Sequence, residues 1–141
     1  MKNMFSLFAG LVLLFSCSKD SGNANQDNYE LNPEELYPII MIHGTLASGD
    51  TYANFSMYFT SNGYPKSYLY SFDWNSLGGS SNTTQNELDA LVNEVLAKTQ
   101  KTKVILMGHS AGGGVGYTYC SDVTRSQKIA KYIHLGSNAQ N

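Results

Sequence analysis

The sequence has 141 residues, a formal net charge of -2 at pH 7 and a sequence pI near 5.8. This length accommodates one folded domain rather than two. The charge is balanced and no basic stripe occurs, which argues against a nucleic-acid-binding function. Hydrophobic residues make up 42% of the chain and aromatic residues 12%, which favours a folded domain over disorder beyond the N-terminal region.

Residues 1–17 have the pattern of a signal peptide. A lysine precedes an apolar run over residues 4–15, which is shorter than the roughly 20 residues needed to span a bilayer. The run ends in Leu-Phe-Ser-Cys at residues 14–17, which resembles the lipobox of bacterial lipoproteins. The resemblance implies that Cys17 is lipidated, becomes the first residue of the mature protein and anchors it to a membrane. The alternative is an ordinary signal peptide that happens to be followed by a cysteine.

Residues 18–36 are predicted to form a flexible polar tether. The segment is rich in Asn, Asp, Glu and Gly and cannot bury enough apolar surface to fold. Its start, Ser18-Lys19-Asp20, resembles the surface-export signal of some bacterial lipoproteins. These features predict an exported, membrane-anchored protein, with the cell surface as one destination.

The only other cysteine of the sequence is Cys120. If Cys17 carries lipid, no intrachain disulfide can form. We therefore expect Cys120 to be a small buried apolar side chain rather than a nucleophile.

The folded region is predicted to begin with a strand within residues 37–43. Its uninterrupted apolar run, Ile39–Ile42, suits a strand buried on both faces of a parallel sheet. Asp50 is a plausible N-cap for a following helix, which Asn62-Gly63 ends. A second strand is expected over residues 67–72. The aromatic residues of the helix are expected to pack in the core: Tyr52, Phe55, Tyr58 and Phe59.

The second half of the chain continues this alternation. Thr84 and Glu87 have the spacing of a capping box, and the apolar residues that follow recur at helical spacing. Strands are predicted over residues 103–109 and 129–135, separated by a helix that runs from Ser110 to about Ser121. Alternating strands and helices predict a parallel sheet with right-handed crossovers.

The sequence Gly-His-Ser-Ala-Gly at residues 108–112 fits the G-x-S-x-G motif in the context that the motif requires, after a strand and before a helix. There the serine is exposed on a sharp turn, and small flanking residues let strand and helix approach. The helix N-terminus directs its free N–H groups at the reacting centre. A dinucleotide or phosphate loop is the alternative, but G-x-G-x-x-G does not fit and no P-loop lysine follows.

The pair His43-Gly44 closes the first strand and resembles the corresponding pair in bacterial lipases and related esterases. Together with the serine motif, it identifies residues 37–141 as similar to the N-terminal part of an α/β-hydrolase. The resemblance implies an incomplete α/β-hydrolase fold, with a mostly parallel sheet and flanking helices. It implies that Ser110 is the nucleophile and that the N–H groups of Thr45 and Ala111 form the oxyanion hole. It also implies a structural role for His43.

The rest of the catalytic triad is not visible in the sequence. In α/β-hydrolases the acid and the histidine follow the serine, on loops after later strands. Asp122 lies about three helical turns from Ser110, and His134 falls inside the fourth predicted strand. We expect the acid and the base beyond Asn141, so that this chain is truncated and has little activity by itself.

The predicted function is hydrolysis of carboxylic esters, with lipids or polyesters as substrates, through an acyl-enzyme on Ser110. Trp74 follows the second strand at its C-terminal end, where open α/β sheets place ligands, so it is a candidate substrate-shaping residue. No cofactor is implied, and no metal site is expected because the three histidines are isolated in sequence: His43, His109 and His134. The alternative is a non-catalytic surface-anchored lipoprotein that binds ligands with a hydrolase-like half-fold.

Overall fold

The computed structural model describes residues 31–136. They form a four-stranded sheet with the order β2-β1-β3-β4, in which every pair of neighbouring strands is parallel. This confirms the predicted α/β class. The strands are β1 (Ile39–Ile42), β2 (Leu69–Phe72), β3 (Val104–His109) and β4 (Ile129–Leu135).

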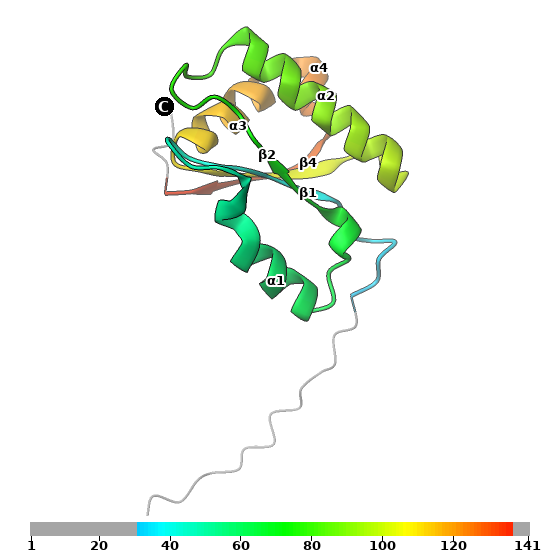
Figure 1. Cartoon of the computed structure of the whole chain (residues 1–141). Coiled ribbons are helices and arrows are strands. Elements are labelled where there is room, and N and C mark those ends of the chain that lie inside the picture. Colours follow the sequence, from blue (N-terminus) through cyan, green and yellow to red (C-terminus); the bar gives the residue numbers. More distant parts are fainter. Residues whose placement is uncertain (1–30, 137–141) are drawn as a thin grey trace, which may run out of the picture.

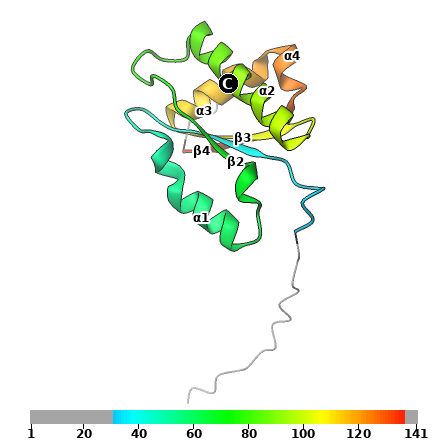
Figure 2. The same cartoon turned by 45° about the vertical axis from the view of Figure 1, so that its right-hand side comes forward.

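Helices cover both faces of the sheet, as Figure 1 shows. The face that carries α1 has one helix, whereas α2, α3 and the short α4 lie on the other face, and Figure 2 shows the same division. The helical segments are η1 (Gly49–Tyr52), α1 (Ala53–Ser61), η2 (Lys66–Tyr68), α2 (Asn82–Thr99), α3 (Ala111–Ser121) and α4 (Val123–Ser126), of which η1 and η2 are 3₁₀ helices.

Successive residues of β1 point to opposite faces of the sheet and so enter two different cores. Ile40 and Ile42 pack with Leu88 and other residues of α2 and α3 in the larger core. Ile39 and Met41 belong to a smaller core on the α1 face, as do Tyr52 and Met107. All four residues of β1 are buried, as expected for a strand covered on both faces.

Two predicted helix caps were wrong. The side chain that caps α2 is Ser81, whose Oγ accepts a hydrogen bond from the N–H of Thr84 at 3.2 Å, and Thr84 itself is buried inside the first turn. Asp50 is not an N-cap either, because the 3₁₀ turn η1 begins at Gly49 after Ser48 and places Asp50 in its first turn. In both cases the chain enters the helix earlier than the capping residues suggested.

The expectation that the aromatic residues of η1 and α1 fill the core was correct for only part of the set. Tyr52 is buried and Phe59 packs against the smaller core, but Phe55 and Tyr58 are 43% and 68% exposed. Figure 1 shows α2, α3 and α4 on the opposite face of the sheet, so among the described elements none of these helices covers the outward side of α1. Hydrophobicity alone did not distinguish the two sides of the helix.

Cys120 is partly buried and packs against the larger core. Burial raises the pKa of its thiol to about 11, which keeps it protonated and unreactive at neutral pH. The prediction of a buried, inert cysteine therefore agrees with its environment.

Cys17 and the signal-peptide pattern lie outside the described residues. The last part of the predicted tether forms a turn in which the N–H of Glu35 donates to Asn32 O at 3.0 Å. The ammonium group of Lys101 donates to Pro33 O and Glu34 O at 3.2 and 2.6 Å, which ties this turn to the domain. Within residues 31–136, no helix is both long and apolar enough to cross a membrane.

Candidate active site

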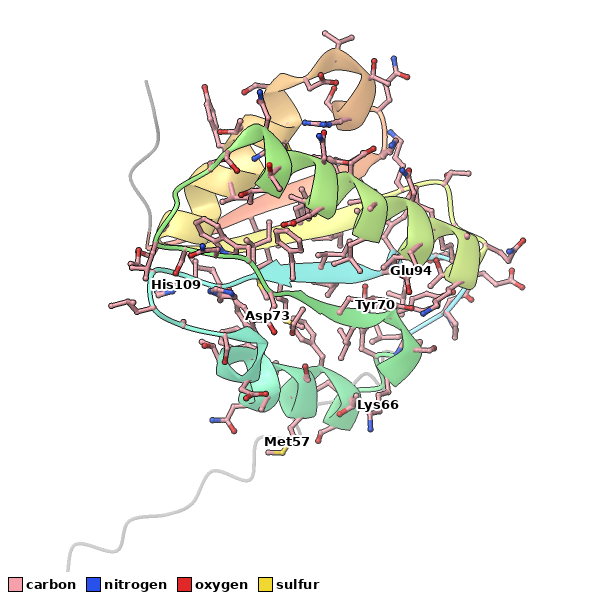
Figure 3. All side chains as sticks on the ribbon, turned by 45° about the horizontal axis from the view of Figure 1, so that its top comes forward. Met57, Lys66, Tyr70, Asp73, Glu94 and His109 are labelled. Atoms are coloured by element: carbon pink, nitrogen blue, oxygen red, sulfur yellow. The ribbon has the colours of Figure 1, made fainter. Side chains whose placement is uncertain are left out.

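Ser110 lies on the sharp turn between β3 and α3. Its backbone has φ 50° and ψ -122°, a region that a residue with a side chain rarely occupies. Two hydrogen bonds of 2.9 Å hold the turn, from Ser110 N–H to Leu135 O and from Gly113 N–H to Ser110 O. The turn therefore places Ser110 at the carboxyl end of the sheet, at the N-terminus of α3. In Figure 3 the neighbouring His109 marks this end of the sheet.

Glycine is required on both sides of the turn. A Cβ on Gly108 would lie 2.5 Å from Gly112 O, and a Cβ on Gly112 would lie 2.3 Å from Ile42 O and 2.5 Å from His43 O. Each of these contacts is with backbone, which cannot move aside as the end of a side chain can. The glycines of the motif thus allow α3 to start directly against the ends of β1 and β3.

The segment after β1 abuts the serine. A Cβ built on Gly44 would lie 3.2 Å from Ser110 Cβ and 3.1 Å from His109 Nδ1. Thr45 follows directly and is exposed, while Ala111 is the first residue of α3 and half-buried. Among the residues that the structure describes, no acceptor takes the backbone N–H of Thr45 or Ala111.

His43 is buried and both of its ring nitrogens are engaged. Nδ1 lies 2.8 Å from Gly44 O, and Nε2 lies 3.2 Å from the N–H of Trp74, with Asp73 Oδ1 at 3.3 Å. With Nδ1 as the donor to Gly44 O, Nε2 can accept the N–H of Trp74. This arrangement accords with a structural role for His43.

Trp74 lies beneath the same segment, with 8% of its surface exposed. Its ring stacks on His43 with centroids 5.9 Å apart, and its Nε1–H donates to His43 O at 3.0 Å. The buried ring of Trp74 offers little surface for direct contact with a substrate. Any effect of Trp74 on a substrate would therefore be mainly indirect, through the position of the segment that starts at His43.

Sequence analysis missed Tyr52 as a support of the site. Its hydroxyl donates to Ile42 O at 2.7 Å, just before the His43-Gly44 pair. Burial raises the pKa of Tyr52, and a hydrogen bond with the His109 backbone opposes this rise. Tyr52 thus connects the ends of β1 and β3 next to the turn. The helical pattern revealed only its apolar face, because the partners of the hydroxyl are distant in sequence.

Asp122 and His134, the acid and the histidine that follow Ser110 in the sequence, lie at the end of α3 and within β4. Asp122 lies beyond the far end of α3, where its Oδ1 caps α4 by accepting from the N–H groups of Thr124 and Arg125, both at 2.9 Å. His134 lies in β4, with its ring 4.2 Å from the Tyr132 ring and 6.5 Å from the Tyr117 ring, measured between centroids. These positions match those expected from the sequence.

The parallel sheet, the strained serine between β3 and α3, and the adjoining His-Gly segment are those of the α/β-hydrolase class. Within residues 31–136, no group of His, Cys, Asp and Glu side chains could hold a metal ion. Residues 36–126, more than half of the chain, match the family Lipase (class 2). The chain belongs to this family.

Among solved structures, the fold is similar to that of the lipase BlEst2 from Bacillus licheniformis, in its propeptide form. The TM-score is 0.60 and the sequence identity 21%, over 72% of this chain and 22% of that lipase chain. The present chain thus spans about a fifth of the length of that lipase. At this identity the similarity shows a shared fold.

Proposed function

We propose that this chain supplies the nucleophile and the oxyanion site of a lipase- or esterase-like serine hydrolase. The observation that carries the proposal is Ser110, held in a strained conformation at the N-terminus of α3 and in contact range of Gly44. Backbone strain of this kind persists where the surrounding structure holds it, and it is typical of reactive sites. The G-x-S-x-G turn is the setting in which such a serine attacks esters.

The reaction proceeds by acyl transfer. Ser110 Oγ attacks the ester carbonyl while a general base removes its proton, and the N–H groups of Thr45 and Ala111 stabilise the negative oxygen that forms. The tetrahedral intermediate collapses, and the alcohol leaves with the proton. Water, activated by the same base, then attacks the acyl-enzyme, releases the carboxylic acid and restores the serine.

The general base and the acid that orients it are proposed to lie outside residues 31–136. Asp122 already serves as the cap of α4, at the end of α3 remote from Ser110. His134 lies within β4 rather than on a loop after it.

Apolar esters, as in lipids or polyesters, are the proposed substrates. Leu46 and Leu77 are 78% and 76% exposed on the two loops next to the site, and the N–H of Leu46 is bonded to Ser76, the residue before Leu77. Exposed leucines at this position favour an apolar acyl group over a charged one.

Export and anchoring through a lipid on Cys17 are proposed from the sequence. Radiolabelled palmitate should be incorporated into the native protein and not into Cys17→Ser. Equal incorporation into both would contradict the anchor.

A serine-directed phosphonate tests the proposed function. The native, folded protein should be labelled, and Ser110→Ala should lose the label. Ser121→Ala, at the opposite end of α3, is the matched control and should be labelled like the wild type. A native protein that is folded but never labelled would contradict the enzyme and favour a binding lipoprotein.

A further inference from the structure

We propose that Ser76 is a positioning residue for the oxyanion site. Together with Asp73 and Trp74, it holds the loop of residues 43–49, the oxyanion loop, in the conformation that aims the N–H of Thr45 at the reacting carbonyl oxygen. The inference rests on the proposed function and adds to it the residues that keep the oxyanion donor in place.

The loop after β2 contacts the oxyanion loop at its start, its middle and its end. At the start, Trp74 donates its backbone N–H to His43 Nε2 and its indole N–H to His43 O. In the middle, Ser76 Oγ accepts the N–H of Leu46 at 2.9 Å. At the end, Asp73 Oδ1 accepts the N–H of Gly49 at 2.8 Å. Figure 3 shows Asp73 near the end of the sheet where His109 lies.

The middle contact restrains a strained residue. Leu46 has φ 57°, in the left-handed region that favours glycine, and its side chain is 78% exposed. Packing of that side chain therefore contributes little to holding the conformation. Gln100 has a similar φ of 55°, but it is the C-cap of α2, where a left-handed residue commonly ends a helix. Leu46 follows no helix; its own N–H is held by Ser76 Oγ at 2.9 Å, and the turn around it is closed by the longer bond from Ala47 N–H to Gly44 O.

This contact acts on the peptide next to the oxyanion donor. Thr45 and Leu46 are the central residues of a turn that is closed by a long hydrogen bond of 3.4 Å from Ala47 N–H to Gly44 O. Ser76 holds the N–H of Leu46, which belongs to the peptide that links Thr45 to Leu46. When this peptide is fixed, the backbone of Thr45 can rotate less. The N–H of Thr45, which belongs to the peptide before it, is then restricted in direction. Without Ser76, only the long 3.4 Å bond would close the turn.

The test compares Ser76→Ala, Ser76→Thr and Asn75→Ala in the full-length native protein. Ser76→Ala removes the acceptor, whereas Ser76→Thr retains a hydroxyl at the same position. Asn75→Ala is the matched control, because the hydrogen bond of Asn75 Oδ1 is to the N–H of Leu77 within its own loop rather than to the oxyanion loop. Amide hydrogen exchange of Leu46 reports the contact directly, without any need for turnover.

We expect Ser76→Ala to lose the exchange protection of Leu46. Loss of an oxyanion donor lowers kcat by about 100- to 1000-fold, so a misdirected donor should lower it by at least about tenfold. KM should stay within about twofold, because the donor acts mainly in the transition state. Ser76→Thr should restore both protection and kcat, and Asn75→Ala should resemble the wild type.

Unchanged protection of Leu46 in Ser76→Ala would overturn the proposal, as would lost protection with unchanged kcat. A rise in KM alone would also overturn it, since it would indicate substrate contact rather than positioning. Failure of the proposed function has a different signature, namely a folded wild type in which the phosphonate does not label Ser110. A labelled wild type with unaffected Ser76→Ala kinetics would contradict the positioning role alone.

Discussion

The two faces of the sheet differ in how completely their helices cover it. On the face of α2 and α3, side chains from both helices are fully buried against β1 and β3, among them Leu88, Val92 and Val115. On the face of α1, Tyr52 is the one fully buried residue that the helical region contributes, and Phe55, Met57 and Tyr58 are exposed. Hydrophobicity alone therefore does not determine burial on the α1 face, where exposed Phe55, Met57 and Tyr58 accompany buried Tyr52.

The difference also separates two ways of attaching a helix to a sheet. α3 begins on glycines that bring its backbone against β1, so its position is set by backbone contacts next to the candidate nucleophile. α1 is attached at its start through Tyr52, whose ring fills the smaller core and whose hydroxyl bonds to Ile42 O. The site lies where these two attachments meet, at the carboxyl end of the sheet.

Truncation of a buried α2 residue should have the largest effect on stability. Leu88→Ala should lower the free energy of unfolding by about 2–5 kcal/mol, because it leaves a cavity in the larger core. The α1 counterpart, Tyr58→Ala, should change it by less than about 0.5 kcal/mol, since that side chain is 68% exposed. Urea denaturation of the native protein measures both. Equal losses of unfolding free energy in Leu88→Ala and Tyr58→Ala would mean that the two side chains are equally buried, which would contradict the difference between the two faces.

A substitution at Gly112 should prevent the close approach of α3 to β1. In Gly112→Ala the new Cβ would meet Ile42 O at 2.3 Å, so the turn must shift. We expect a loss of at least about 3 kcal/mol, the upper part of the range for overpacking. The same variant should react poorly with the phosphonate. Wild-type stability and labelling would show that α3 can move away from β1 without cost.

The α2–α3 face is further tied by Asp89, which accepts hydrogen bonds from Tyr119 at 2.6 Å and Lys128 at 2.8 Å. Asp89→Asn should cost roughly 1–3 kcal/mol at neutral pH, because Lys128 loses its charged partner. Glu94→Gln, in the exposed pair with Lys98, is the control and should leave the stability nearly unchanged, because solvent screens that pair.

The pH dependence sharpens this prediction. Partial burial acts to raise the pKa of Asp89, but hydrogen bonds from Lys128 and Tyr119 outweigh it and lower the pKa. A carboxyl with a lowered folded-state pKa adds stability above its unfolded pKa of about 4 and loses it as the pH falls through the folded-state pKa. The stability gap between wild type and Asp89→Asn should therefore be constant near neutral pH and narrow below about pH 4. If the stability difference between wild type and Asp89→Asn widened in acid, the pKa of Asp89 would be raised on folding, which would contradict the prediction.

The smallest expected effect is an increase in the free energy of unfolding. Gly114 lies in α3, but a Cβ added there would meet no atom within 4 Å. Gly114→Ala should stabilise the protein by about 0.5–1 kcal/mol through helix propensity, and phosphonate labelling of Ser110 should not change. Thermal denaturation would detect the gain. A destabilised Gly114→Ala would show that α3 is confined on both of its sides.

Much of the site could be predicted because its signals are local. The apolar strand before Ser110 and the glycines around the serine are typical of a strand–turn–helix unit, and all of these residues are close together in the chain. The support from Ser76 could not be derived in this way. Its partner, Leu46, is 30 residues away, and only the parallel pairing of β1 with β2 brings the two loops together. The sequence did show that residues 73–76 follow a strand and so lie at the ligand-binding end of the sheet. It did not show which residue Ser76 would bond.

By itself, the sequence determined the alternation of strands and helices, the buried character of β1 and the identity of the candidate nucleophile. Each of these depends on residues close together in the chain, through periodicity, turn chemistry and backbone sterics. Only the tertiary structure decided which aromatic residues of α1 are buried, which serine caps α2 and which side chains hold the oxyanion loop. These outcomes depend on which segments become neighbours when the sheet assembles, and sequence spacing does not encode those distances.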